Sequence, residues 1–257
     1  MLFKRPHEHF RRQDWVAVII EFVIVGAGVF LGLQVNNWNE ARVNNERGHT
    51  FLVRIHGDLE AEAAAIDRRI TFVGQVLGYA RGALAFAEDG ALVDGSSWKT
   101  VLAFYQASQL YPTISFDATY REMTSVGDLR LIRDQRLSAD LSDYYAGTST
   151  NGGLPTLFAQ IPAYRETIRG LTPFSVQSYI WANCHRVLPN NNQQMIDCAS
   201  PITDAQARAI LRDFTADPQA VRQLRFWATQ MSVENTVKVR QRADVVELAA
   251  ETARLTN

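Results

Sequence analysis

The chain has 257 residues, with 26 basic and 27 acidic side chains and a formal net charge of −1. This balance argues against a general nucleic-acid binder, which carries a basic excess or patch. The length accommodates one membrane anchor and one domain of roughly 200 residues, large enough to bury its own core. Only one long segment is apolar throughout, which argues against several membrane spans.

Residues 15–35 predict a transmembrane helix. From Trp15 to Leu33 every residue is apolar or glycine except Glu21, and as a helix this stretch rises about 28 Å, close to the hydrocarbon thickness of a lipid bilayer. The indole rings of Trp15 and Trp38 suit the two membrane–water interfaces. A buried helix of a soluble protein is the alternative, but such helices are rarely apolar on every face over this length.

The basic tail before this helix predicts the topology. Residues 1–14 contain four cations, Lys4, Arg5, Arg11 and Arg12. Because basic flanks stay in the cytoplasm, residues 36–257 are expected on the other side of the membrane. A cleaved signal peptide is the alternative, but the apolar run is longer than usual and no cleavage site of small residues follows it. We therefore expect an uncleaved signal anchor.

One face of the predicted anchor combines small and polar residues. At about 100° per residue, Glu21, Val25, Gly28, Gly32 and Asn39 fall within about 80° of one another. Glycines let a second backbone approach closely, and an intramembrane carboxylate normally faces protein or water. We call these five residues the anchor stripe and predict that they pack on a second copy or on another integral membrane protein. The alternative is that Glu21 extends toward the inner headgroups.

The glycines of the anchor also look like the phosphate-binding turn of a dinucleotide-binding unit. Such a unit needs a strand before the glycines, a helix after them and an acid closing a second strand. Here the apolar run that includes Val23 continues through Gly32, and no second strand pattern follows. Helix packing is therefore the better interpretation.

Residues 33–40 have the sequence Leu-Gln-Val-Asn-Asn-Trp-Asn-Glu and end a stretch that begins at Glu21. This stretch resembles an uncharacterised bacterial family, a domain of unknown function, whose members begin with a short basic tail and one transmembrane helix ending in that signature. A second block, from Thr119 to Tyr145, is similar to the same family. The resemblance implies a protein of the bacterial inner membrane with a cytoplasmic N-terminus and a periplasmic C-terminal domain. It implies no activity and no catalytic residues.

The first part of the periplasmic domain is expected to be helical. Apolar residues recur at steps of three and four from Leu52 onward, which predicts one long helix to about Ala87. Ser96 or Ser97 is expected to cap a second helix that continues through Leu110.

Local signals predict two further helices. Asp117 opens a short helix that Gly127 closes in a left-handed cap. Asp134 caps the next helix, which ends near Tyr145.

The rest of the domain is also expected to be helical, with one irregular part. Residues 155–169 predict a helix that Pro162 kinks, and the chain is less regular from there until Thr203, which begins another helix. Pro218, at the first helical position, begins the last helix, which continues to about Leu255 and could lie antiparallel to the first. The predicted fold is all-α, a bundle on two long antiparallel helices with shorter helices between them.

Cys184 and Cys198 lie in the turn-rich stretch 181–201. Thiols oxidise outside the cytoplasm, so a disulfide closing this loop is the first interpretation. Two free thiols are an alternative. A metal site with His185 is another, but it would need a fourth ligand and a tighter pairing of the cysteines. No metal and no cofactor are therefore expected.

No sequence motif for catalysis is present. His49 and His56 share a helix face and are interpreted as part of a solvated surface. Glu60 and Glu62 point to different faces of a helix, which argues against a catalytic pair. Four aromatic residues are interpreted as core, namely Tyr144, Tyr145, Trp181 and Trp227.

These observations favour a non-enzymatic accessory or scaffolding subunit. Such a subunit would dock through its transmembrane helix to a larger respiratory, photosynthetic or transport complex and brace it on the periplasmic side. The alternative is a periplasmic sensor or ligand-binding domain, which a deep apolar pocket inside the bundle would favour. An envelope enzyme is a third hypothesis, for which the sequence offers no clustered titratable residues.

Overall fold

The computed structural model describes residues 15–111, 116–148, 162–188 and 192–256, so the predicted tail at 1–14 lies outside the described residues. The chain forms two compact units, Met1–Phe51 and Leu52–Asn257.

The first unit consists, in its described part, of the beginning of α1 (Trp15–Asp89). The helix starts at Trp15 as predicted and continues without interruption past residue 35. By length and composition α1 is apolar enough in this region to cross a membrane, and none of its most apolar window is buried within the chain. The prediction of one long apolar N-terminal helix is confirmed.

The second unit is almost entirely helical, which confirms the predicted all-α fold. After the end of α1, its helices are α2 (Ser97–Gln106), α3 (Ala118–Ser125), α4 (Gln135–Thr148), α6 (Ala163–Leu171), α7 (Phe174–Asn183), α8 (Asp204–Ala216) and α9 (Pro218–Thr256). Two short 3-10 turns, η2 (Val93–Gly95) and η3 (Asp128–Leu131), connect some of them.

Most helix starts follow the capping residues that the sequence predicts. The hydroxyl of Ser96 accepts a hydrogen bond from the backbone N–H of Lys99 at the start of α2, and Asp134 caps α4 in the same way. Thr203 and Gln206 form a reciprocal capping box at the start of α8. Gly127, after α3, has a positive φ of 75°, as expected for a left-handed cap.

Two predictions about the middle of the chain are wrong. Pro162 does not kink a helix but stands directly before Ala163, in extended backbone, where its missing N–H costs α6 nothing. The predicted end of α2 at Leu110 is also too late, because the helix ends at Gln106 and Ala107 is its C-cap. The predicted helical residues 155–161 lie outside the described residues.

The stretch expected to be irregular contains regular structure. Helix α7 follows Pro173, and an antiparallel hairpin of β1 (His185–Leu188) and β2 (Asn192–Met195) comes next, with His185 opposite Met195. An isolated two-stranded hairpin is marginal in water. This one is enclosed by the disulfide between Cys184 and Cys198, which joins the chain just before β1 to the chain just after β2.

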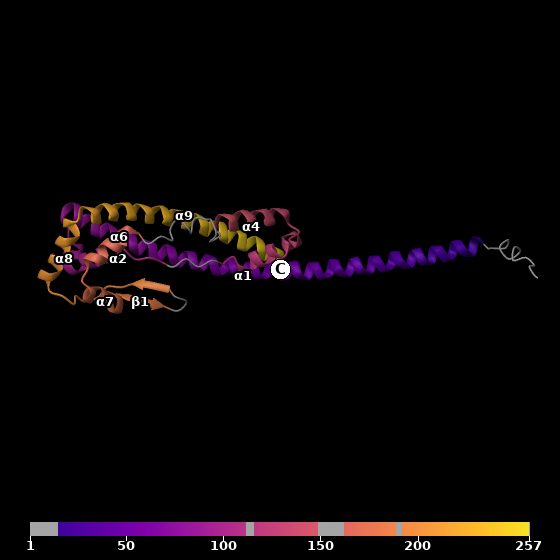
Figure 1. The fold of residues 1–257 in the computed structure, drawn as a ribbon, viewed down its shortest axis with the longest axis horizontal. Helices are drawn as coiled ribbons and strands as arrows, with labels where there is room; N and C mark the ends of the chain where they lie inside the picture. The colour runs from indigo at the N-terminus through magenta and orange to yellow at the C-terminus, as the bar shows by residue number, and fades with distance from the viewer. Residues whose placement is uncertain (1–14, 112–115, 149–161, 189–191, 257) are drawn as a thin grey trace, which may run out of the picture. The chain divides into compact units, whose positions relative to one another are not determined.

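The two long helices of the second unit are antiparallel. The imidazole of His56, early in this part of α1, lies 3.0 Å from the carbonyl of Ala249, near the end of α9. Glu88, at the other end of α1, accepts a hydrogen bond from Arg225, near the start of α9. Figure 1 shows α9 lying along the second half of α1, so the predicted antiparallel arrangement is confirmed.

Buried and partly buried residues recur at alternating three- and four-residue steps along both helices, and we call this set of residues the seam. On α1 it comprises Leu52, Ile55, Leu59, Glu62, Ile66, Arg69, Val73, Val76, Ala80 and Ala83, and on α9 it comprises Leu224, Trp227, Met231, Glu234, Lys238, Gln241, Val245, Leu248 and Thr252. This is the spacing of helices that pack side chains between one another along a shared axis. The apolar seam residues are buried, and the charged residues, together with Gln241, lie near its middle.

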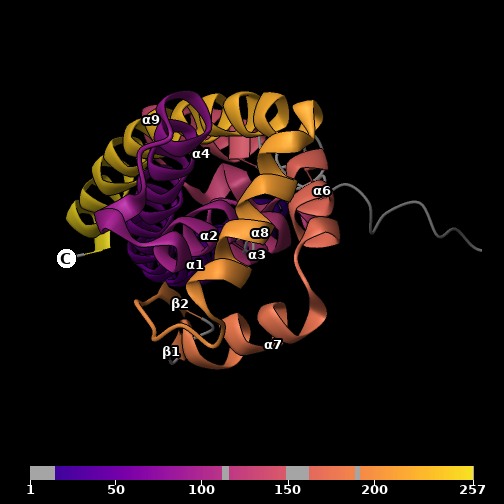
Figure 2. The same cartoon turned by 90° about the vertical axis from the view of Figure 1, so that its left-hand side faces the viewer.

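Helix α2 completes the core. Every residue from Ser97 to Gln106 except Lys99 is buried, and Figure 2 shows α2 surrounded by other helices of this unit. The buried hydroxyl of Tyr164 on α6 donates to the carbonyl of Phe104 over 2.8 Å. The indole of Trp227 on α9 donates to the carbonyl of Ala107 over 2.8 Å, so α6 and α9 are both tied to α2.

Candidate functional site

The structure brings all five residues of the anchor stripe onto one face of α1. Glu21, Val25, Gly28, Gly32 and Asn39 lie within one uninterrupted helix, so their angular spacing holds as predicted. All five are exposed. A Cβ atom built on Gly28 or Gly32 would meet no atom within 4 Å, which leaves the backbone accessible along this face.

Large apolar side chains surround the stripe on the other faces of the same segment. Phe22 is 79% exposed and Phe30 is 60% exposed. A soluble protein rarely exposes a continuous apolar surface of this kind, which marks a site of contact with lipid or with another protein. The stripe and its surroundings are therefore the first candidate site.

A second set of functional groups lies in the middle of the seam. The guanidinium of Arg69 on α1 donates to the carboxylate of Glu234 on α9. The side chain of Glu234 is 1% exposed and that of Arg69 is 11% exposed. Arg69 also lies 3.4 Å from the carbonyl of Tyr111. A buried ion pair of this kind is costly to desolvate, and removing one partner leaves the other charge stranded.

Next to this ion pair along the seam, Glu62 on α1 and Lys238 on α9 add a second anion and a second cation. The amide Nε2 of Gln241 donates to Glu62 and to the hydroxyl of Tyr144, over 3.1 Å in each case. The ammonium of Lys238 donates to Oε1 of Gln241 over 2.6 Å. Burial raises the pKa of Glu62 and lowers the pKa of Lys238. We call Arg69, Glu234, Lys238, Gln241 and Glu62 the polar layer; its two cations and two anions balance.

Two open grooves lie between α4 and α9, and one of them borders the polar layer. One, of about 340 Å³, is lined by residues that include Lys238 and Gln241, and the other, of about 440 Å³, is lined by residues that include Arg136 and Glu251. Both grooves include Tyr144. These are shallow surfaces with several charged side chains, and they differ from the deep apolar pocket that a ligand-binding domain would favour.

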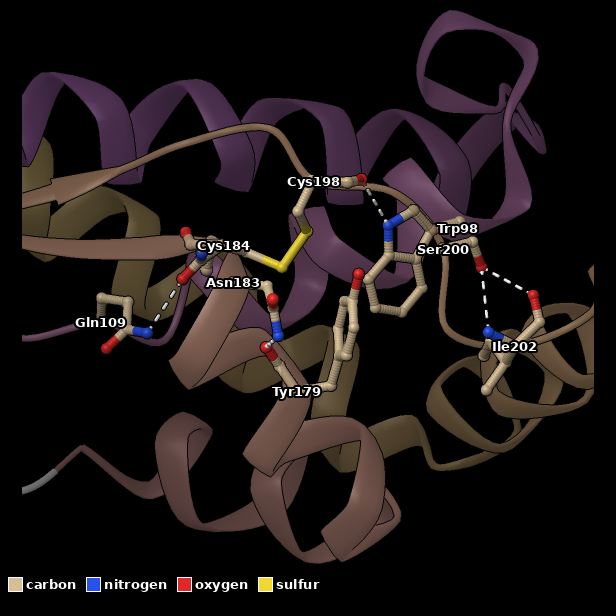
Figure 3. Close-up of a disulfide and its surroundings, with 9 residues drawn as sticks. Trp98, Gln109, Tyr179, Asn183, Cys184, Cys198, Ser200 and Ile202 are labelled. Atoms are coloured by element: carbon tan, nitrogen blue, oxygen red, sulfur yellow. Dashed lines mark hydrogen bonds between the residues drawn. A yellow bond between two sulfur atoms is a disulfide. The ribbon is translucent and has the colours of Figure 1, made fainter.

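The disulfide between Cys184 and Cys198 confirms the predicted pairing, with the two Cα atoms 5.1 Å apart. Figure 3 shows its surroundings. The indole of Trp98 donates to the carbonyl of Cys198 over 3.1 Å, and the amide of Gln106 donates to the carbonyl of Cys184 over 3.0 Å. Both donors belong to α2, so the disulfide fixes the hairpin to the core and has a structural role.

Some predicted side-chain roles change. His56 is not on a solvated face, because its Nδ1 contacts Ala249 and Thr252 on α9, while its Nε2 lies near Glu60. Trp181 is half exposed and stacks on His185, so it is not core. The other three aromatic residues are buried as predicted, and Glu60 is exposed while Glu62 is buried, as expected for different faces.

The polar layer is not among the sites that the sequence predicted. The available signal was the seam itself, because Glu62 and Arg69 continue the three-and-four spacing of the apolar residues on α1. Glu234, Lys238 and Gln241 do the same on α9. Charged residues at core positions of a helix indicate a buried network.

No family model, curated protein or solved structure matches the chain. The resemblance carried by residues 33–40 therefore stays a prediction.

Proposed function

We propose that this protein is a single-pass accessory or scaffolding subunit of the bacterial inner membrane. The apolar part of α1 spans the bilayer, the anchor stripe docks on a larger integral membrane protein, and the domain at 36–257 braces that complex in the periplasm. The observation that carries this proposal is the wholly exposed apolar segment with glycines and a carboxylate aligned on one face.

Lipid covers the apolar faces of the segment but does not suit the stripe. A carboxylate at membrane depth normally faces protein or water, and small residues at this spacing allow close packing of a second helix. The basic residues of the tail at 1–14 support a cytoplasmic N-terminus, and therefore a periplasmic domain.

A different protein is a better occupant than a second copy. In a symmetric pair of parallel helices, the same stripe would meet itself and place Glu21 against Glu21. Two carboxylates at close range repel unless one holds a proton. A helix of another protein can instead offer a cation or a hydroxyl to Glu21, and so satisfies the carboxylate.

The test compares two glycines of the same segment. Gly28 lies on the stripe, whereas Gly26 lies about 140° from Glu21 on another face, and neither has a neighbour within 4 Å of a built Cβ. Tagged protein is purified from gently solubilised native membranes and its partners are separated on a native gel. Wild type and Gly26→Leu should recover a larger complex at a fixed ratio, and Gly28→Leu should lose it. Recovery of the complex by Gly28→Leu, or of the chain alone by wild type, would contradict the proposal.

A further inference from the structure

Two arginines of α6 converge near the end of α2. Arg165 Nη1 donates to the carbonyl of Ser108 over 2.7 Å and lies 3.4 Å from Oε1 of Gln109. Arg169 Nη2 donates to the same Gln109 oxygen over 3.0 Å, and its Nε lies 3.4 Å from the hydroxyl of Ser108. The guanidinium of Arg169 also lies over the ring of Tyr105, 4.8 Å from its centre. Two cations therefore meet at one neutral amide oxygen.

Among the residues that the structure describes, no carboxylate forms an ion pair with either arginine. The internal segments outside that part, 112–115, 149–161 and 189–191, contain no aspartate or glutamate. Both arginines are partly buried. Buried cations are normally paired, so this arrangement is unusual.

Burial is the main reason that the pKa of Arg165 falls, to about 10, and the charge of Arg169 is the second reason. Burial also lowers the pKa of Arg169. A guanidinium group keeps its charge at neutral pH, so the site holds two positive charges side by side.

A structural role in capping α2 accounts for only part of this geometry. Carbonyls at a helix end and an aromatic face attract cations, but they carry partial charges. One arginine would satisfy the carbonyl of Ser108. The second adds repulsion, which a capping role gives no reason to accept.

The amide of Gln109, whose oxygen accepts from the arginines, is held in place by buried hydrogen bonds. Gln109 is 3% exposed, and its Nε2 donates to Oε1 of Gln106 over 2.9 Å. Gln106 in turn donates to the carbonyl of Cys184. This chain of hydrogen bonds fixes the amide, and through it the arginines, before any ligand arrives.

We propose that Arg165 and Arg169 form a binding site for a phosphate group, as free phosphate or as a small phosphate monoester. A guanidinium presents two parallel N–H donors that match two oxygens of such a group, and two guanidiniums balance a dianion. This site is separate from the anchor stripe and does not rest on the proposed docking function.

The test measures phosphate binding to the full chain in detergent. Sodium phosphate is titrated against the melting temperature at constant ionic strength, with sodium chloride as the balancing salt, and calorimetry gives the dissociation constant. Wild type should show a saturable rise. Arg169→Gln and Arg165→Gln should each weaken binding at least tenfold. Arg208→Gln, which removes an exposed arginine paired with Asp204 on α8, should bind as wild type does.

Folding is checked by circular dichroism for each variant. Arg169→Lys keeps the charge and should bind more weakly than wild type, because an ammonium lacks the parallel donors of a guanidinium. Glycerol phosphate is the second probe: tighter binding than inorganic phosphate identifies a monoester as the ligand, and equal binding identifies free phosphate. Absence of saturable binding of both probes, or equal binding by wild type and the two glutamine variants, would overturn the proposal.

Discussion

Replacing Glu234 with methionine should destabilise the domain strongly. The carboxylate is 1% exposed and is the partner of Arg69, whose side chain is 11% exposed. Without it, the polar layer would hold the two cations Arg69 and Lys238 against one anion, Glu62, in a buried place. Breaking a buried pair on one side costs about 3–5 kcal/mol. At about 2–4 °C per kcal/mol for a domain of this size, the melting temperature should fall by about 10 °C.

The double variant Arg69→Met/Glu234→Met tests whether the loss of stability comes from leaving one buried charge without its partner. It removes one charge of each sign, so the layer stays neutral and the loss should be smaller than in either single variant. The control is Glu88→Met, which breaks an exposed pair with Arg225 between the same two helices and should cost less than about 1 kcal/mol. Thermal unfolding of the full chain in detergent, followed by circular dichroism, measures these three variants and the single variant Arg69→Met. Additive losses in the double variant would refute the reasoning.

Three further predictions concern stability. Cys198→Ser opens the disulfide loop and should cost about 3 kcal/mol of unfolding free energy; reductant should lower the stability of wild type to that of the variant and leave the variant unchanged. Gly78→Ala should gain up to about 1 kcal/mol, and Gly82→Ala should gain less because its Cβ would lie 2.8 Å from Cγ2 of Val93; equal gains in chemical denaturation would count against this packing. Burial raises the pKa of Glu62, so its contribution to stability is present below its unfolded pKa of about 4 and is lost as pH rises through the folded pKa. The unfolding free energy of wild type minus that of Glu62→Gln should therefore decrease from pH 4 to pH 7, and a constant difference would exclude this assignment.

Local chemistry made most helix boundaries predictable. Ser96, Asp134 and Thr203 are capping residues, and each satisfies backbone N–H groups at the start of its helix. Pro218 begins α9 because a proline at the first helical position loses no hydrogen bond. These signals act within a few residues, so the sequence displays them directly.

Helix α7 and the hairpin were missed because their signals depend on distant parts of the chain. On α7 only Val176 and Ile180 are buried, while Phe174 and Trp181 are exposed, and these exposed apolar residues obscure the helical pattern. Strand β2 is mostly Asn and Gln, which have little preference for strands. The hairpin forms where the disulfide and α2 hold its base.

The buried polar residues were missed for a related reason. Exposed valines such as Val239 and Val246, which are 51% and 40% exposed, obscure the apolar pattern of α9, and the buried Glu234 interrupts it. A charged residue at a buried position interrupts the apolar pattern of a helix even when the three-and-four spacing of buried positions continues through it. The arginines of α6 could not be placed at all, because nothing near Arg165 in the sequence indicates that the end of α2 lies beside it.

The polar layer also sets the alignment of the two long helices. If α9 slid along α1 by one turn, about 5.4 Å, Glu234 would leave Arg69 and face Ile66 or Val73 instead. A seam of similar apolar layers tolerates such slippage, whereas one layer of charges makes the shifted alignments unequal. The pair of helices is thereby locked in a single register and resists a pull along its axis. A strut of this kind transmits force from one end to the other without yielding by sliding.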